Sequence, residues 1–72
     1  MKDARELIWV DPERMSGAPC FRGTRVPVST VFDNLADGLS LDTILEQWPT
    51  LDRQDVLDVL ALAREAVIRE AA

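Results

Sequence analysis

The sequence predicts a mainly α-helical protein, in which a short N-terminal β ribbon precedes a three-helix bundle with the outline of a helix-turn-helix. From Val28 onward, apolar residues recur at helical spacing, and glycine and proline divide this half into three segments. Before it lies a proline-flanked stretch rich in β-branched residues, which favour extended backbone. With 72 residues, we expect a single domain, with the ribbon or arm in residues 1–27 and the helical module in residues 28–72.

Two short segments are the predicted strands of the ribbon. Leu7–Val10 is an apolar run that ends at Pro12, because proline has no N–H to donate to a sheet. Cys20–Val26 lies between prolines that fix φ, and Gly23 within it permits a positive φ. We expect this second segment to form a strand or a tight hairpin, paired either with the first strand or with its copy in a second subunit. A two-stranded ribbon is marginally stable alone, so it needs the helices or a second ribbon against it.

Two helices are predicted in the middle of the chain. The first runs from about Val28 to Asp37, and Gly38 ends it as a C-terminal cap. Ser40 is a good N-cap for the second helix, which Pro49 ends. The tight turn between them gives the helix-turn-helix outline, although three-helix packings without a nucleic-acid role are also common.

A third helix is predicted from about Asp52, which can cap it, to Glu70. One face is expected to cover the other two helices, and a second apolar stripe lies about a third of a turn away, leaving a narrow polar ridge. A helix that is apolar around this much of its circumference is normally covered on more than one side. In so short a chain, we expect another polypeptide to provide the cover. The alternative is that the additional aliphatic residues are tolerated at the surface. The covering face comprises Val56, Val59, Leu60, Ala63 and Val67, the ridge Asp58, Glu65 and Arg69, and the expected partner contacts Leu57, Ala61, Leu62 and Ile68.

Composition argues against catalysis, cofactors and metal sites. The chain has no histidine and no tyrosine, and Cys20 is its single cysteine, so neither an internal disulfide nor the common zinc-ligand sets are available. We therefore expect no enzyme activity, no cofactor and no small-molecule substrate. The N-terminus lacks a signal-peptide pattern and no apolar run approaches the ~18 residues of a membrane span, so we expect a cytoplasmic protein without membrane contact.

The small size predicts an assembly. A single core of this length rarely gives more than about 3–5 kcal/mol without a disulfide, metal or partner. We expect a homodimer formed through the ribbon, because a thin ribbon cannot bury both of its faces by itself. The expected dimer contacts are Trp9, Phe21 and Val26.

Charge distribution bears on DNA binding. The net charge of −5 argues against coating nucleic acid by bulk electrostatics, but the residues up to Pro27 are slightly basic and those from Val28 onward strongly acidic. The exposed side of the second helix would carry Asp42 and Glu46, which repel phosphate and disfavour conventional major-groove reading. If DNA is bound, the expected contacts are Arg14, Arg22 and Arg25, whose alternative role is ion pairing that stabilises the turn.

Five sequence features resemble the bacterial family catalogued as domain of unknown function 433, and together they cover nearly the entire chain. Ala18 replaces the basic residue that often stands between the glycine and proline of that family, which makes the front turn less positive. The features are Ile8 and Val10 ahead of Asp11-Pro12, Ser16-Gly17-x-Pro19, Arg22-Gly23-Thr24-Arg25-Val26-Pro27-Val28, Leu35-Ala36-Asp37-Gly38-Leu39-Ser40, and Ile44-Leu45 ahead of Trp48-Pro49.

The resemblance implies a small helix-turn-helix-like domain that is often paired genetically with a PIN-like ribonuclease and regarded as its antitoxin. On this basis we expect an antitoxin that neutralises a PIN-like ribonuclease toxin and binds operator DNA once the complex forms. An acidic chain with surplus apolar surface suits a basic toxin. A stand-alone DNA-binding transcriptional regulator and a structural adaptor are the alternatives.

Overall fold

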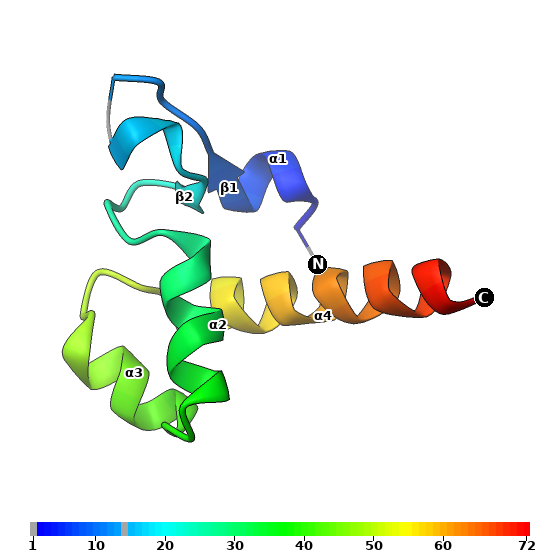
Figure 1. Ribbon diagram of the computed structural model, residues 1–72. Helices are drawn as coiled ribbons and strands as arrows, with labels where there is room; N and C mark the ends of the chain where they lie inside the picture. Colours follow the sequence, from blue (N-terminus) through cyan, green and yellow to red (C-terminus); the bar gives the residue numbers. More distant parts are fainter. Residues whose placement is uncertain (1, 14) are drawn as a thin grey trace.

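The computed structural model describes residues 2–13 and 15–72, and shows a mainly helical chain with one small antiparallel sheet (Figure 1). The prediction of the fold class is therefore confirmed. In chain order, the elements are α1 (Ala4–Leu7), β1 (Ile8–Trp9), the 3-10 helix η1 (Met15–Gly17), β2 (Cys20–Phe21), α2 (Val28–Ala36), α3 (Leu41–Gln47) and α4 (Arg53–Ala71).

The ribbon pairs within one chain. Ile8 lies opposite Phe21 and Trp9 lies opposite Cys20, so the first of the two pairings left open by the sequence is the one formed. The first predicted strand, Leu7–Val10, was too wide, whereas Cys20–Val26 takes the second of its two predicted forms, a tight hairpin. Leu7 ends a helix, and β2 stops at Phe21 because the chain turns there.

Helix α1 was missed by the sequence analysis, although its signal is present. Asp3 and Glu6 form a capping box, in which the Glu6 N–H donates to Asp3 Oδ1 at 3.0 Å and the Asp3 N–H donates to Glu6 Oε1 at 3.4 Å. This reciprocal pair satisfies N–H groups that the first turn of a helix leaves without partners. At one turn in length, α1 has too few residues to show apolar periodicity.

The three larger helices begin and end close to the predicted residues. Ser40 caps α3 by accepting from the Thr43 N–H, and Asp52 caps α4 by accepting from the Gln54 N–H. Helix α2 ends in a Schellman motif, with the Leu39 N–H donating to Asn34 O and the Gly38 N–H donating to Leu35 O, both at 3.0 Å. Gly38 has φ +95°, which explains why glycine stands there.

One hydrophobic core joins the ribbon to the helices. Its side chains come from α1, from β2, from Val26 in the second arm of the hairpin, and from all three larger helices. The largest fully buried side chains are Leu7, Phe21, Val31, Ile44 and Val56. Phe21 is 2% exposed. The helices therefore supply the cover that the ribbon needs, and no second ribbon is required to bury its inner face.

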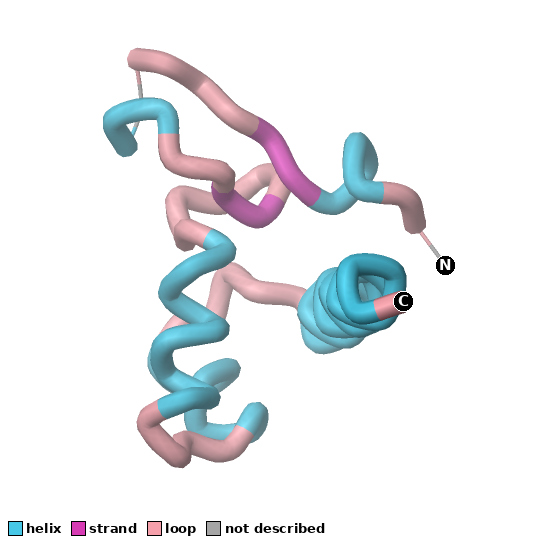
Figure 2. The backbone as a smooth tube through the Cα atoms, turned by 45° about the vertical axis from the view of Figure 1, so that its right-hand side comes forward, coloured by secondary structure: helices cyan, strands magenta, loops and turns pink. Residues whose placement is uncertain are grey.

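The first half of α4 packs one face against the core, and the second half projects from the body (Figures 1 and 2). Val56 and Val59 lie in the core, whereas every residue from Arg64 onward is exposed. The predicted covering face was therefore too long, since Val67 at its far end is 67% exposed. The polar ridge was also wrong at Asp58, which is buried.

The cap of α2 gives a stability prediction. Gly38→Ala is expected to lower the free energy of unfolding by about 1–2 kcal/mol, because a side chain at positive φ is strained. No atom lies within 4 Å of an added Cβ, so the cost comes from the backbone alone. Urea unfolding measures it, with Gly38→Asn as the control expected to lose less, and an alanine variant as stable as the parent would contradict this account.

Candidate functional site

The hairpin turn after β2 is built by Gly23 and Thr24. The Thr24 N–H donates to Phe21 O at 3.0 Å, and Gly23 at the third position has φ +79°, as a type II turn requires. The Thr24 hydroxyl donates to Phe21 O at 2.9 Å and accepts from the Val26 N–H at 3.0 Å. The Phe21 N–H then donates to Val26 O at 3.0 Å and closes the hairpin.

This closure directs two side chains inward and positions α2. Phe21 and Val26 both enter the core, and Pro27 follows as the N-cap of α2 with φ −62°. The Val28 N–H donates to Pro19 O at 2.9 Å, which ties the start of α2 to the far side of β2. The segment from Arg22 to Val28 is therefore a structural joint between the ribbon and the helices.

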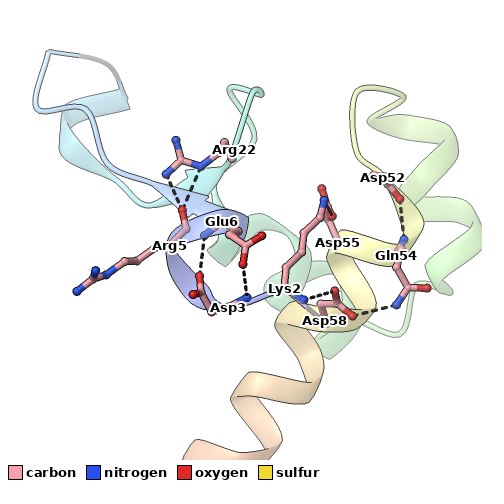
Figure 3. Close-up of polar contacts among 9 residues, drawn as sticks. All are labelled: Lys2, Asp3, Arg5, Glu6, Arg22, Asp52, Gln54, Asp55 and Asp58. Atoms are coloured by element: carbon pink, nitrogen blue, oxygen red, sulfur yellow. Dashed lines mark hydrogen bonds and ion pairs between the residues drawn. The ribbon is translucent and has the colours of Figure 1, made fainter.

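Arg22 belongs to this joint. Its guanidinium donates to Arg5 O from Nε at 3.1 Å and from Nη2 at 2.6 Å (Figure 3). Nη2 also donates to Ile8 O at 3.3 Å. Its backbone N–H donates to Leu7 O at 2.8 Å. The carbonyl of Arg5 lies in the last turn of α1 and has no partner within the helix, so Arg22 supplies one. The guanidinium that was predicted to contact DNA is occupied by α1 and β1.

Arg25 differs from Arg22 in its contacts. Both residues are exposed, but the Arg25 side chain makes no hydrogen bond or ion pair with another residue of the segments 2–13 and 15–72. Within these segments, Arg25 does not form the turn-stabilising ion pair that was predicted as its alternative role. The third predicted DNA contact, Arg14, lies outside the described residues.

A groove lies between the hairpin turn and the connection from α3 to α4. Its volume is about 690 Å³, and Trp9, Arg25, Pro27 and Trp48 contribute to its walls. The Trp9 indole N–H donates to Thr24 O at 3.3 Å, which fixes one wall against the turn. Trp9 and Trp48 are distant in sequence, and the sequence analysis gave no reason to place them together.

The three predicted dimer contacts are not equivalent. Phe21 and Val26 are buried inside their own chain. The premise that the ribbon needs a second chain to cover these two side chains was therefore wrong. Trp9 is half-buried and keeps accessible surface at the groove. Cys20 is buried, as expected for a small hydrophobic side chain.

The four predicted partner contacts on α4 also separate into two groups. Leu57 and Ile68 are 41% and 51% exposed, and they lie on one stripe of the helix with Ala61, which is half-buried. Leu62 packs against the core. Val67 is more exposed than any of the four. The sequence analysis assigned it to the covering face because helical periodicity does not show where along α4 the body of the protein ends.

The start of α4 is held by the N-terminal segment (Figure 3). The Lys2 ammonium lies 2.8 Å from Asp55 Oδ1, and this pairing raises the pKa of Lys2. Asp58, only 5% exposed, accepts from the Gln54 side-chain amide at 2.9 Å and from the Lys2 backbone N–H at 3.2 Å. These hydrogen bonds favour the carboxylate and lower the pKa of Asp58.

The acidic residues at this helix start have capping and pairing roles. Asp52 caps the helix, Asp55 pairs with Lys2, and Asp58 is satisfied as described above. Within residues 2–13 and 15–72 there is no group of three or more side chains that could hold a metal ion. Nor does this part of the chain contain a helix long and apolar enough to cross a membrane.

The exposed side of α3 carries the acidic residues expected from the sequence. Asp42 and Glu46 are exposed, and Arg53 at the start of α4 pairs with Asp42. The guanidinium of Arg53 thus offsets the negative charge of Asp42, whereas Glu46 has no such ion-pair partner within segments 2–13 and 15–72. The helix that would enter a major groove therefore offers phosphate little attraction.

Comparison with known proteins identifies the chain through the segment that contains this joint. The family described as "Protein of unknown function (DUF433)" matches residues 8–63, from β1 into α4. The chain belongs to the DUF433 family. The match includes the whole hairpin joint and both tryptophans of the groove, and it ends before the exposed second half of α4.

A relative of this DUF433 chain is "Uncharacterized protein y4eO" of Sinorhizobium fredii (strain NBRC 101917 / NGR234). The two are 43% identical over 53 residues, which is 74% of this chain and 24% of the relative. The match thus spans about a quarter of that relative's length. No solved structure matches the chain at a significant level.

The two arginines of the DUF433 motif give a matched pair of variants. Arg22→Ala is expected to lower the free energy of unfolding by about 1–2 kcal/mol, because it removes charge-assisted hydrogen bonds to α1 and β1. Arg25→Ala, at an exposed position without such bonds, is expected to change it by less than about 0.5 kcal/mol. Chemical denaturation measures both, and equal losses at the two positions would refute the division of roles.

The buried carboxylate gives a pH prediction. The folded pKa of Asp58 lies below its unfolded value of about 3.9, so the stabilisation is complete above that pH and is lost as the pH falls through the folded pKa. Gln54→Ala removes the hydrogen bond that lowers this pKa most, and is expected to raise it. Carbon-detected NMR titration of the Asp58 carboxyl measures the shift, and identical titrations in parent and variant would contradict it.

Proposed function

We propose that this DUF433 chain is a non-enzymatic antitoxin that binds a PIN-like ribonuclease toxin through the exposed part of α4. The observation that carries the proposal is the projection of α4: its second half leaves the body of the protein, yet it retains large apolar side chains (Figure 1). Exposed apolar surface of this kind is typical of a segment that binds another polypeptide.

Three apolar residues of α4 lie on one stripe of the helix. Leu57 and Ile68 are exposed and Ala61 is half-buried, at i, i+11 and i+4. Amphipathic helices that enter a hydrophobic groove present their anchors on one such face. Val67 extends the apolar surface beyond that stripe. We define the α4 surface as Leu57, Ala61, Val67 and Ile68.

The charge of the chain supports a basic partner. The net charge is −5, and most of the carboxylates lie from Val28 onward, in the same half of the chain as the α4 surface. Complementary charge speeds the encounter of two proteins and selects among partners. In the proposed complex, the toxin is inhibited because the bound helix covers or distorts its active site.

Operator binding and homodimer formation are supported by fewer structural observations than binding through α4. Of the three arginines predicted to contact operator DNA, Arg25 is the one whose described side chain is not hydrogen-bonded, because Arg22 is bonded to α1. The exposed side of α3 is acidic. A homodimer through the ribbon has Trp9 as its accessible contact. Both stay predictions, and the geometry favours neither over binding through α4.

Binding through α4 is tested with the product of the adjacent gene. Leu57→Asp combined with Ile68→Asp is expected to weaken the complex by about 1,000-fold and to abolish copurification, because two central apolar contacts are worth about 4 kcal/mol together. Val10→Asp, at another exposed apolar residue, is the control for added charge. Circular dichroism checks that each variant is folded.

Two outcomes would overturn this proposal. Unchanged copurification of the double variant would exclude the α4 surface, and a bound partner without nuclease activity would indicate a structural adaptor in place of an antitoxin.

A further inference from the structure

We propose that the groove between the hairpin turn and the α3–α4 connection is a second binding site, which takes an extended peptide segment of a partner protein carrying an aromatic or proline residue next to a carboxylate. The site is separate from the α4 surface, because the elements that form it lie away from the projecting end of α4 (Figures 1 and 2). The inference therefore does not depend on the antitoxin proposal.

The walls of the groove suit an apolar ring. Trp9 comes from β1 and Trp48 from the C-terminal cap of α3, and both side chains are half-buried. The hydrogen bond from the Trp9 indole to Thr24 O holds that ring in place before any ligand arrives. At about 690 Å³, the groove falls in the range of about 300–1,000 Å³ that is usual for ligand sites.

Arg25 supplies the charge. It stands in the hairpin joint, but unlike Arg22, Gly23 and Thr24 it is not used by the described residues to build that joint. Among the groove-lining residues of segments 2–13 and 15–72, Arg25 is the one charged residue and there is no carboxylate, although the net charge of the protein is −5. A cation beside apolar walls selects a ligand that is both apolar and anionic.

The same charge count favours a peptide over nucleic acid. Single-stranded nucleic acid is held by a basic groove that follows several phosphates. The described lining of this groove contains a single arginine, on a protein of net charge −5. One carboxylate needs only one guanidinium. Pro27, with φ −62° and ψ 143°, gives this side of the groove an extended backbone, and aromatic-lined grooves commonly bind extended, proline-containing segments.

The tryptophans provide a direct readout. Trp9 and Trp48 are the two tryptophans of the protein, so its two indole N–H signals in a ¹⁵N-correlated NMR spectrum both report on the groove. We expect acetyl-Pro-Phe-Glu-Pro-amide at millimolar concentration to shift both signals in a saturable way. The matched peptide with glutamine in place of glutamate is expected to bind about five-fold more weakly, as is Arg25→Gln with the original peptide.

A second arginine serves as the control. Arg64→Gln changes an exposed arginine of α4, outside the groove, and is expected to leave the peptide affinity unchanged. The proposal is overturned if neither indole signal moves at 5 mM peptide, or if Arg25→Gln and Arg64→Gln have equal effects. It is also overturned if oligo-dT binds there more tightly than the peptide, or if both signals shift with protein concentration alone, which would assign the groove to a second copy of the chain.

Discussion

The hydrogen bond that closes the hairpin between Phe21 and Val26 holds the ribbon to the helices. A chain of this size has one small core, and that core requires Phe21 and Val26 to point inward from both arms of the turn. Gly23 provides the positive φ, and the Thr24 hydroxyl satisfies groups on both sides of the turn. Pro27 then begins α2 directly, so the turn also fixes where the helices start.

The contacts around α1 add to this constraint. Arg22 holds the end of α1 from the hairpin side, while Asp55 and Asp58 of α4 hold Lys2, the residue ahead of the N-cap of α1. Polar contacts at each end of a single helical turn thus link the ribbon to the longest helix. Since isolated short helices are marginal in water, α1 owes its order to these tertiary contacts.

The two proposed binding surfaces lie at separate places. The second half of α4 presents aliphatic side chains on a projecting helix, whereas the groove combines two tryptophans with one arginine. The first surface suits a hydrophobic groove on a partner, and the second suits an extended acidic segment. A protein with both can hold a folded partner and a peptide segment at the same time.

Local sequence determined the three larger helices, their caps at Ser40, Gly38 and Asp52, and the tight turn at Gly23, because each depends on residues a few positions apart. It also identified Leu57 and Ile68 as surplus apolar residues. Other features depend on packing, which local patterns do not contain: Phe21 is covered by the helices of its own chain, Asp58 is buried, and the guanidinium of Arg22, unlike that of Arg25, is hydrogen-bonded to α1. Tertiary structure also brought Trp9 to Trp48 at one groove, since contacts between distant segments depend on how the elements pack, which no short stretch of sequence specifies.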